Sequence, residues 1–201
     1  MGIRVENSFM VPTGIEQAWT ILIDVPRIAP CMPGAELTEV VDATTYKGQA
    51  RVKIGPVQLV FSGEARLHDT DPVNRVSKLS IRGSDTKGRG NIQSEMSFSL
   101  AAEGDQTRVN VVTDLTLTGS VAQYGRGAGL IKEICNQFAN QFANNLAARI
   151  QSGDEGVAPG EAKPLSAIGL VSGAVRAMVT CKTQSDTDSQ QHTPSQLPPE
   201  K

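Results

Sequence analysis

The chain has 201 residues, of which 39% are hydrophobic and 20% charged, and its formal net charge is −2. This length suits one domain of ordinary size with an extension. The balanced charge, without a basic cluster, excludes nucleic acid as the main partner, and 4% aromatic residues are too few for a base-stacking platform.

The cysteines and the N-terminal sequence point to a reducing compartment. Cys31, Cys135 and Cys181 are far apart in the sequence and form no C-x-x-C pair. Their odd number argues against a disulfide framework, so we expect free thiols in the cytoplasm. The start, MGIRVENSFMV, has no basic region followed by a long apolar run, so no secretory signal is expected.

A strand followed by two short helices is predicted at the beginning of the chain. Apolar residues of one parity recur from Ile3 to Val11, which is the period of a half-buried strand. Thr13 and Glu16 have the spacing of a capping box, which predicts a helix start at Thr13. Prolines at positions 26, 30 and 33 divide the following residues into a second helical turn and a bend.

The central part of the chain predicts an antiparallel sheet. After Gly34 the hydrophobic period changes to two, and turn residues such as Gly55-Pro56 separate the apolar runs. Strands joined by short turns form an antiparallel meander, since parallel crossovers would need helices between them. The predicted strands comprise residues 37–41, 45–54, 57–68, 75–81, 91–101 and 108–119.

A long amphipathic helix is predicted for residues 121–150. Its apolar side chains recur three and four positions apart and share one face, namely Leu130, Ile131, Ile134, Cys135, Phe138, Phe142 and Leu146. A single helix of this kind must cover an apolar surface. We therefore expect it to close over the inner face of a curved antiparallel sheet.

The strand positions that should face this helix include several small or polar residues: Gly48, Ala50, Gly63, Ala65, Ser94 and Thr113. A solidly packed core would carry larger side chains there, so the pattern indicates a cavity. The alternative is that a sharply curved sheet needs small residues where it bends. The residues themselves support both explanations equally.

The composition changes after Ile150. Residues 151–164 are rich in Gly, Ala and charge and predict a linker, and residues 181–201 are polar and predict a disordered tail. Between them, residues 165–180 are apolar, and at helical spacing one stripe comprises Leu165, Ile168, Val171, Val175 and Val179. This segment could dock on a partner protein, lie on a membrane or fold back on its own domain.

The chain is poor in residues that carry catalysis or bind metal. His68 and His192 are its two histidines, and no cysteine lies at ligand spacing, so no zinc site is expected. Asp69 and Asp71 precede Pro72 and fit a turn better than an acid–base pair. The GRGAGL sequence at residues 125–130 departs from G-x-G-x-x-G and lies in no βαβ unit. We therefore predict a protein that is not an enzyme.

The chain resembles the CoxG family of carbon monoxide dehydrogenase subunits, which is part of the START/Bet v 1-like (SRPBCC) superfamily. The similarity covers residues 3–150, and its most specific parts are the C-M-P-G-A bend at residues 31–35 and the I-G-P turn at residues 54–56. Supporting stretches are Ala18-Trp19, Asp24-Val25-Pro26, Phe61-Ser62-Gly63, Asp69-Thr70-Asp71-Pro72, Thr107-Arg108-Val109 and Gln137-Phe138-Ala139.

The resemblance implies an α+β helix-grip fold over residues 1–150. In this fold a curved antiparallel sheet of about seven strands wraps around a long C-terminal helix, and two short helices follow the first strand. It also implies a non-catalytic accessory protein of a molybdenum-containing carbon monoxide dehydrogenase or related hydroxylase. Such a protein would lie at the inner face of the cytoplasmic membrane and bind a lipid or a quinone (menaquinone or ubiquinone), with no tightly bound cofactor. The alternatives are a pure adaptor without ligand and an enzyme acting on an apolar substrate.

The expected ligand site lies between the long helix and the inner face of the sheet. Met32 and Pro33 are predicted at its mouth, where Tyr124 could hydrogen-bond a quinone carbonyl. The predicted lining comprises Ala50, Val52, Leu59, Phe61, Met96, Leu115, Tyr124, Ile134, Phe138 and Phe142. The stripe that begins at Leu165 is the predicted docking segment for partner or membrane.

Overall fold

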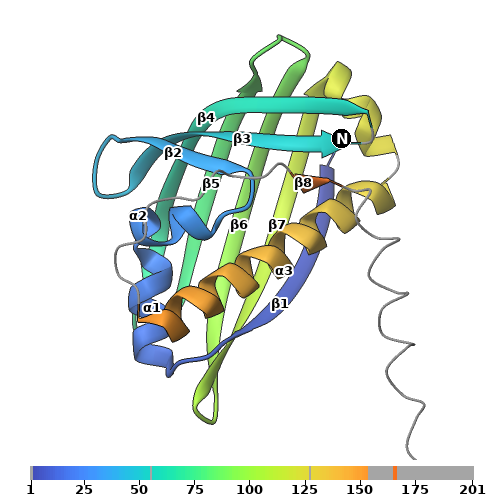
Figure 1. Ribbon diagram of the computed structural model, residues 1–201. Helices are drawn as coiled ribbons and strands as arrows, with labels where there is room; N and C mark the ends of the chain where they lie inside the picture. The colour runs from blue at the N-terminus through green and yellow to red at the C-terminus, as the bar shows by residue number, and fades with distance from the viewer. Residues whose placement is uncertain (1, 55, 127, 154–164, 167–201) are drawn as a thin grey trace, which may run out of the picture. The chain divides into compact units, whose positions relative to one another are not determined.

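A curved antiparallel sheet with a long helix on its inner face forms the described part of the protein (Figure 1). The computed structural model describes residues 2–54, 56–126, 128–153 and 165–166. The strands are β1 (Gly2–Val11), β2 (Ala35–Val40), β3 (Thr45–Ile54), β4 (Val57–Asp71), β5 (Val76–Asp85), β6 (Gly90–Glu103), β7 (Gln106–Gly119) and β8 (Leu165–Ser166). The helices are α1 (Ile15–Ile23), α2 (Val25–Ile28) and α3 (Ala128–Ser152), with 3-10 turns η1 (Ala29–Cys31) and η2 (Ser120–Arg126).

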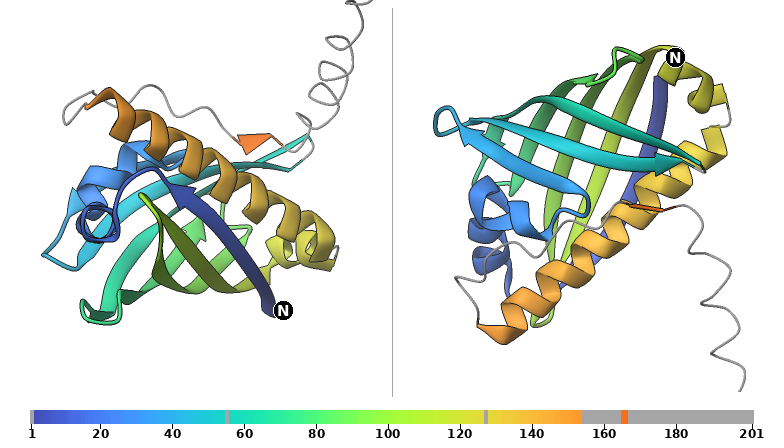
Figure 2. Two further views of the ribbon diagram at one scale, coloured as in Figure 1. Left: turned by 90° about the horizontal axis from the view of Figure 1, so that it is seen from below. Right: turned by 45° about the horizontal axis from the view of Figure 1, so that its top comes forward.

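The predicted helix-grip fold is confirmed. The strand order is β1-β7-β6-β5-β4-β3-β2, and β8 adds a short parallel pairing with β3. Every pair of neighbours except β1–β7 and β3–β8 is also consecutive in the sequence. The predicted strand at residues 45–54 agrees with β3 in both bounds, and the two short helices follow β1 as expected. In Figure 2 the helix α3 runs diagonally across the concave side of the sheet.

Two local predictions need correction. The N-cap of α1 is Gly14 rather than Thr13, and it makes no side-chain cap hydrogen bond. Glu16 takes no part in a capping box because its carboxylate pairs with the guanidinium of Arg75. The helix expected from residue 121 begins only at Ala128, after the 3-10 turn η2. Glycine is a poor helix former, so the glycines of residues 125–129 favour this delayed start.

A row of glycines lets neighbouring strands approach closely where the sheet bends. Gly48 pairs with Gly63, and Gly63 pairs with Gly83 on β5. A Cβ atom at Gly63 would lie 2.6 Å from Cα of Gly83 and would overlap the carbonyl oxygen of Arg82. Only glycine fits there without a backbone shift. The small inward residues of the sequence therefore serve the bend at this row.

The apolar core is divided into two clusters at opposite ends of the sheet. The first joins α1, α2 and η1 to the C-terminal half of α3, and its buried members include Trp19, Leu100 and Leu146. The second joins β1, the β3–β4 end of the sheet and η2 to the N-terminal half of α3, and includes Leu59 and Ile131. Each cluster removes apolar surface from water at about 25 cal/mol per Å². The inner face between the clusters belongs to neither.

Asp85, at the end of β5, ties the β5–β6 hairpin to β4. Its side chain is fully enclosed and forms an ion pair with Arg89, with 2.8 Å between Oδ1 and Nη2. The backbone N–H groups of Lys87 and Arg89 donate to Oδ2 at 3.0 and 3.2 Å, and Arg89 also donates to the carbonyl of Gln58 at 2.9 Å. The Arg89 guanidinium, with these N–H groups, holds the pKa of Asp85 well below its usual range.

Asp85→Asn is expected to lower thermal stability at neutral pH, and the deficit should shrink in acid. Because the folded pKa of Asp85 is lowered, its carboxylate stabilises the fold above the unfolded pKa of about 3.9. This contribution is lost as the pH falls below that value toward the folded pKa. Melting curves from pH 7 to pH 3 by circular dichroism measure the difference. Asp105→Asn, in the exposed β6–β7 turn, is the control, and a deficit for Asp85→Asn that did not change with pH would contradict the assignment.

Candidate functional site

The middle of the inner sheet face carries a half-buried apolar floor. Cross-strand pairing aligns Ala65 with Ile81 and Ile81 with Ser94, and aligns Leu79 with Met96 and Met96 with Thr113. We call these six residues of β4 to β7 the inner floor. Ser94 is at the limit of full burial with 9% exposure, and the other five remain partly exposed although they face the helix. A solidly packed interior would bury them, so the floor has space beside it.

Helix α3 crosses the inner face of the sheet over this floor. Its backbone runs close to β1, η1, η2 and β8, whereas β4, β5 and β6 lie farther away. Asn7 Nδ2 on β1 donates to Asn136 Oδ1 at 2.6 Å, and Asn145 Nδ2 donates to the Cys31 carbonyl at 3.0 Å. Phe142 meets Phe9 edge to face, with the ring centroids 5.7 Å apart. The helix is thus fixed along one edge of the sheet and at both ends, and its middle faces the floor.

The predicted lining residues fall into three groups. Leu59, Phe61 and Leu115 are buried in the second core cluster, where Val52 and Ile134 pack against them. Phe142 is buried in the first cluster, and Met32 packs against that cluster. Residues that belong to neither cluster and stay half-buried are Ala50, Met96 and Phe138. Of the predicted lining positions whose side chains are described, these three are the ones outside the packed core clusters.

The remaining predicted positions lie away from the inner floor or outside the described residues. Pro33 is half-buried in the bend before β2, and the side chain of Tyr124 lies outside the described residues. Leu165 pairs with Val52 in parallel as part of β8, instead of beginning a helical stripe. The β3 edge is free there because β2 reaches only as far as Ala50. Ile168, Val171, Val175 and Val179 lie outside the described residues.

Two lining positions on β5 were missed by the sequence prediction. Leu79 and Ile81 face the helix side of the sheet, because they pair with Leu67 and Ala65 on β4. The predicted strand at residues 75–81 stopped short of the real end at Asp85. The alternation of Leu79, Ile81 and Gly83 with polar residues indicates that these three positions share one face of the strand. The pairing of Gly63 with Gly83 shows that this face continues as far as residue 83.

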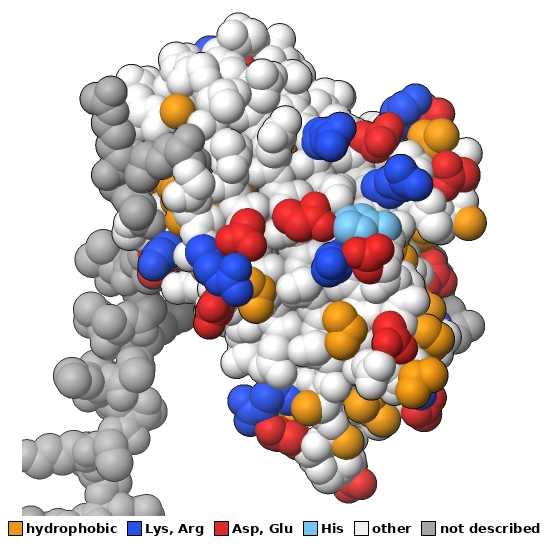
Figure 3. All heavy atoms as spheres, turned by 180° about the vertical axis from the view of Figure 1, so that it is seen from behind, with side chains coloured by type: hydrophobic (Ala, Val, Ile, Leu, Met, Phe, Trp, Pro, Cys, Tyr) orange, Lys and Arg blue, Asp and Glu red, His pale blue; other side chains and the backbone are white. Residues whose placement is uncertain are grey.

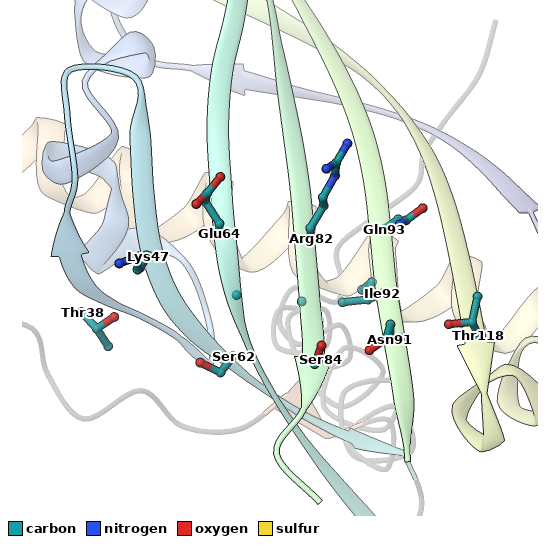
Figure 4. A pocket seen from close by; sticks show the side chains of 12 residues that line it. Thr38, Lys47, Ser62, Glu64, Arg82, Ser84, Asn91, Ile92, Gln93 and Thr118 are labelled. Atoms are coloured by element: carbon teal, nitrogen blue, oxygen red, sulfur yellow. The ribbon is translucent and has the colours of Figure 1, made fainter. Parts of the chain in front are cut away.

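The pockets described on this surface lie on the opposite, outer face of the sheet. One of about 560 Å³ has polar side chains from β3 to β7 around it, including Ser62, Glu64, Arg82 and Gln93 (Figure 4). A second, of about 400 Å³, is lined by Glu64, Arg66, His68, Ser80 and Arg82. Figure 3 shows charged side chains of both signs over this face. These pockets suit polar groups rather than an apolar ligand.

A hydrogen-bond network surrounds His68 on the outer face. His68 Nε2 lies 2.8 Å from both Ser80 Oγ and Glu95 Oε1, and Nδ1 lies 3.4 Å from Asp69 Oδ2. Ser80 donates its single hydroxyl proton to Glu95 Oε2 at 2.6 Å. A serine nucleophile would have to donate to the imidazole instead. His68, Ser80 and Glu95 therefore form a hydrogen-bond network between neighbouring strands, and Ser80 is not oriented as a nucleophile.

The inner side offers little for acid–base chemistry. The inner floor consists of uncharged residues, and burial raises the pKa of the Cys135 thiol on α3, which favours its neutral form. Among the described residues no group of His, Cys, Asp and Glu is placed to hold a metal ion. No described helix is long and apolar enough to cross a membrane. The inner side of this domain can offer a ligand apolar contact and few hydrogen bonds.

Comparisons with known proteins give one matching family and several solved structures with a similar fold. The carbon monoxide dehydrogenase subunit family CoxG matches residues 8–151, and no curated protein matches the sequence.

A conserved protein from Geobacillus kaustophilus is similar in structure, with a TM-score of 0.66 and 19% identity over 75% of this chain and 97% of that one. The Zhui aromatase/cyclase from Streptomyces sp. R1128 has a TM-score of 0.53 and 15% identity over 78% of this chain and 100% of its own. Norcoclaurine synthase from Thalictrum flavum has a TM-score of 0.54 and 12% identity, over 77% and 89% respectively. At these identities the solved structures show the fold alone.

Proposed function

Because the chain belongs to the CoxG family of carbon monoxide dehydrogenase subunits, we propose that it is a non-catalytic accessory protein of a molybdenum-containing hydroxylase. It would bind a respiratory quinone or a lipid between α3 and the inner floor. In this role it would link the enzyme to the inner face of the cytoplasmic membrane. Carbon monoxide dehydrogenase is the partner that the family name suggests.

One observation carries the ligand part of this proposal. The floor between the two core clusters is mainly apolar, and five of its six residues stay partly exposed under a helix that is fixed at its ends. An isoprenoid or acyl chain would bind there by burial of apolar surface, at about 25 cal/mol per Å². About 400 Å² of buried surface would contribute about 10 kcal/mol before the costs of association. The uncharged lining supports binding without chemical conversion.

Ligand extraction and titration test the proposal. We expect an organic extract of the purified protein to contain a quinone or lipid that mass spectrometry identifies. Trp19 is the only tryptophan of the chain and packs in the core cluster beside the floor, 6.2 Å from Phe98 between ring centroids. Added menaquinone or ubiquinone should quench its fluorescence with saturation at one equivalent.

Deletion of residues 152–201 distinguishes the carrier from a pure adaptor. A carrier keeps its ligand after the deletion, because the floor and α3 up to residue 151 remain. An adaptor loses its function and shows no ligand in either form. An empty extract together with quenching that rises linearly without saturation would contradict the carrier function.

A further inference from the structure

Two arginines on the outer sheet face have side chains without a polar partner among the described residues. Lys78 Nζ donates to Asp69 Oδ2 at 2.9 Å, and both oxygens of Glu95 are engaged by Ser80 and His68. Within the described part of the chain, neither the Arg66 nor the Arg82 side chain forms a hydrogen bond or an ion pair. Most other ionic side chains around them are therefore neutralised inside the protein, and these two are not.

Arg82 has an acidic neighbour with which it forms no ion pair. Glu64 is its direct cross-strand partner, where opposite charges would normally attract. In Figure 4 the Glu64 and Arg82 side chains extend side by side from neighbouring strands, and their charged groups do not meet. Both groups therefore remain available to a molecule that approaches this face.

Arg66 and Arg82 line the same pocket of about 400 Å³. Arg66 pairs with Ser80, and Arg82 is two residues further along β5, so the two arginines are diagonal neighbours on one face. Diagonal neighbours are separated by about 7–8 Å at Cα, which long side chains can bridge around one group. A guanidinium donates two parallel hydrogen bonds to a carboxylate, so the pair can hold one oxyanion from two sides.

We propose that this pocket is a docking site for an acidic side chain of a protein partner. Glu64 lies in the same pocket and would repel a second negative charge, which disfavours a polyanion such as nucleic acid or an anionic lipid surface. The adjoining pocket of about 560 Å³ shares Glu64 and Arg82 and adds Ser62, Ser84 and Asn91. One ion pair surrounded by hydrogen-bonding side chains is typical of the polar part of a protein interface.

This docking site rests on the proposed function for the identity of its partner, the molybdenum hydroxylase. It places the contact on the face of the sheet opposite to the ligand floor. The full-length chain would then bind ligand and enzyme on separate surfaces. Variants of the two surfaces should therefore have independent effects.

The test measures binding of the purified hydroxylase to the immobilised full-length chain by biolayer interferometry. The double substitution Arg66→Gln and Arg82→Gln should weaken binding about tenfold, mostly through a slower association rate at low salt. Arg66→Lys with Arg82→Lys should recover part of the loss. Arg4→Gln is the matched control, because Arg4 lies on β1 and already pairs with Asp114 at 3.2 Å.

The outcomes separate the docking site from the proposed function. Equal binding of the wild type and the Gln double variant would overturn the docking site and leave the accessory role intact. Failure of the wild type to bind the hydroxylase would overturn both the docking site and the choice of partner, whereas quinone titration would still report on the carrier. Stronger binding to anionic phosphatidylglycerol vesicles than to the hydroxylase, lost in the Gln double variant, would also overturn the assignment to a protein.

Discussion

Gly63→Ala is expected to destabilise the protein by about 3 kcal/mol or more, enough to prevent folding of a marginal domain. The added Cβ would overlap the carbonyl oxygen of Arg82 and lie 2.6 Å from Cα of Gly83. Both are backbone atoms of a paired strand, so they cannot move without breaking the β4–β5 ladder. Urea unfolding followed by circular dichroism measures the change in the free energy of unfolding.

Gly83→Ala is the matched control for this prediction. A Cβ atom at Gly83 would lie 3.2 Å from Ile92 Cγ2 and 3.4 Å from the Ser62 carbonyl oxygen, so a shift of a few tenths of an ångström relieves the contact. Its cost should stay near 1 kcal/mol, the lower end of the overpacking range. Similar costs for Gly63→Ala and Gly83→Ala would show that the close approach at Gly63 does not constrain the bend.

Ala65→Trp is expected to weaken ligand binding while the domain stays folded. Ala65 lies in the inner floor and remains half-buried, so an indole would occupy the space that the proposed ligand needs. We expect an affinity loss of at least about tenfold, equal to about 1.4 kcal/mol of binding free energy. Quinone quenching of Trp19 would be confused by a second tryptophan, so equilibrium binding of a radiolabelled quinone is the measurement.

The same substitution also distinguishes a hollow interior from a packed one. In a packed interior, Trp at position 65 would strain the core and cost about 1–3 kcal/mol of stability. In a hollow one, the free energy of unfolding should change little, and the indole should even bury apolar surface. Ala101→Trp, at an exposed position of β6, controls for the chemical change itself. Unchanged ligand affinity in Ala65→Trp would place the ligand elsewhere.

Hydrophobic periodicity was sufficient to predict the order of elements. The alternation of residues 45–54 and 57–67 predicted both β3 and β4 and the face of each that turns inward, as the burial of Leu59 and Phe61 confirms. The i, i+3 and i, i+4 stripe predicted α3, whose buried residues Ile131, Phe142 and Leu146 lie on it. These patterns are visible in the sequence because a sheet and a helix must each bury one face.

Features that depend on contacts between distant residues were not predictable in this way. The N-cap of α1 is Gly14 rather than Thr13, and Glu16 pairs with Arg75, which is 59 residues away in the sequence. The division of the core into two clusters depends on where α3 crosses the sheet, which periodicity does not specify. For the same reason, the predicted lining mixed buried core residues such as Leu59 with the half-buried Met96 and Phe138. The two arginines of the outer-face pocket stand out only when both strands and their described neighbours are placed.

The split core also has a consequence for the lifetime of the proposed carrier. With nothing on the floor, the two clusters are joined chiefly by β-ladders and by one helix, so the middle of the domain contributes little apolar stabilisation of its own. A bound guest would act as the missing third cluster, and at a hundred times its dissociation constant it would add about 2.7 kcal/mol to the folded state. Loaded molecules would therefore survive proteolysis longer than empty ones, and the cellular pool of this protein would follow the supply of its cargo.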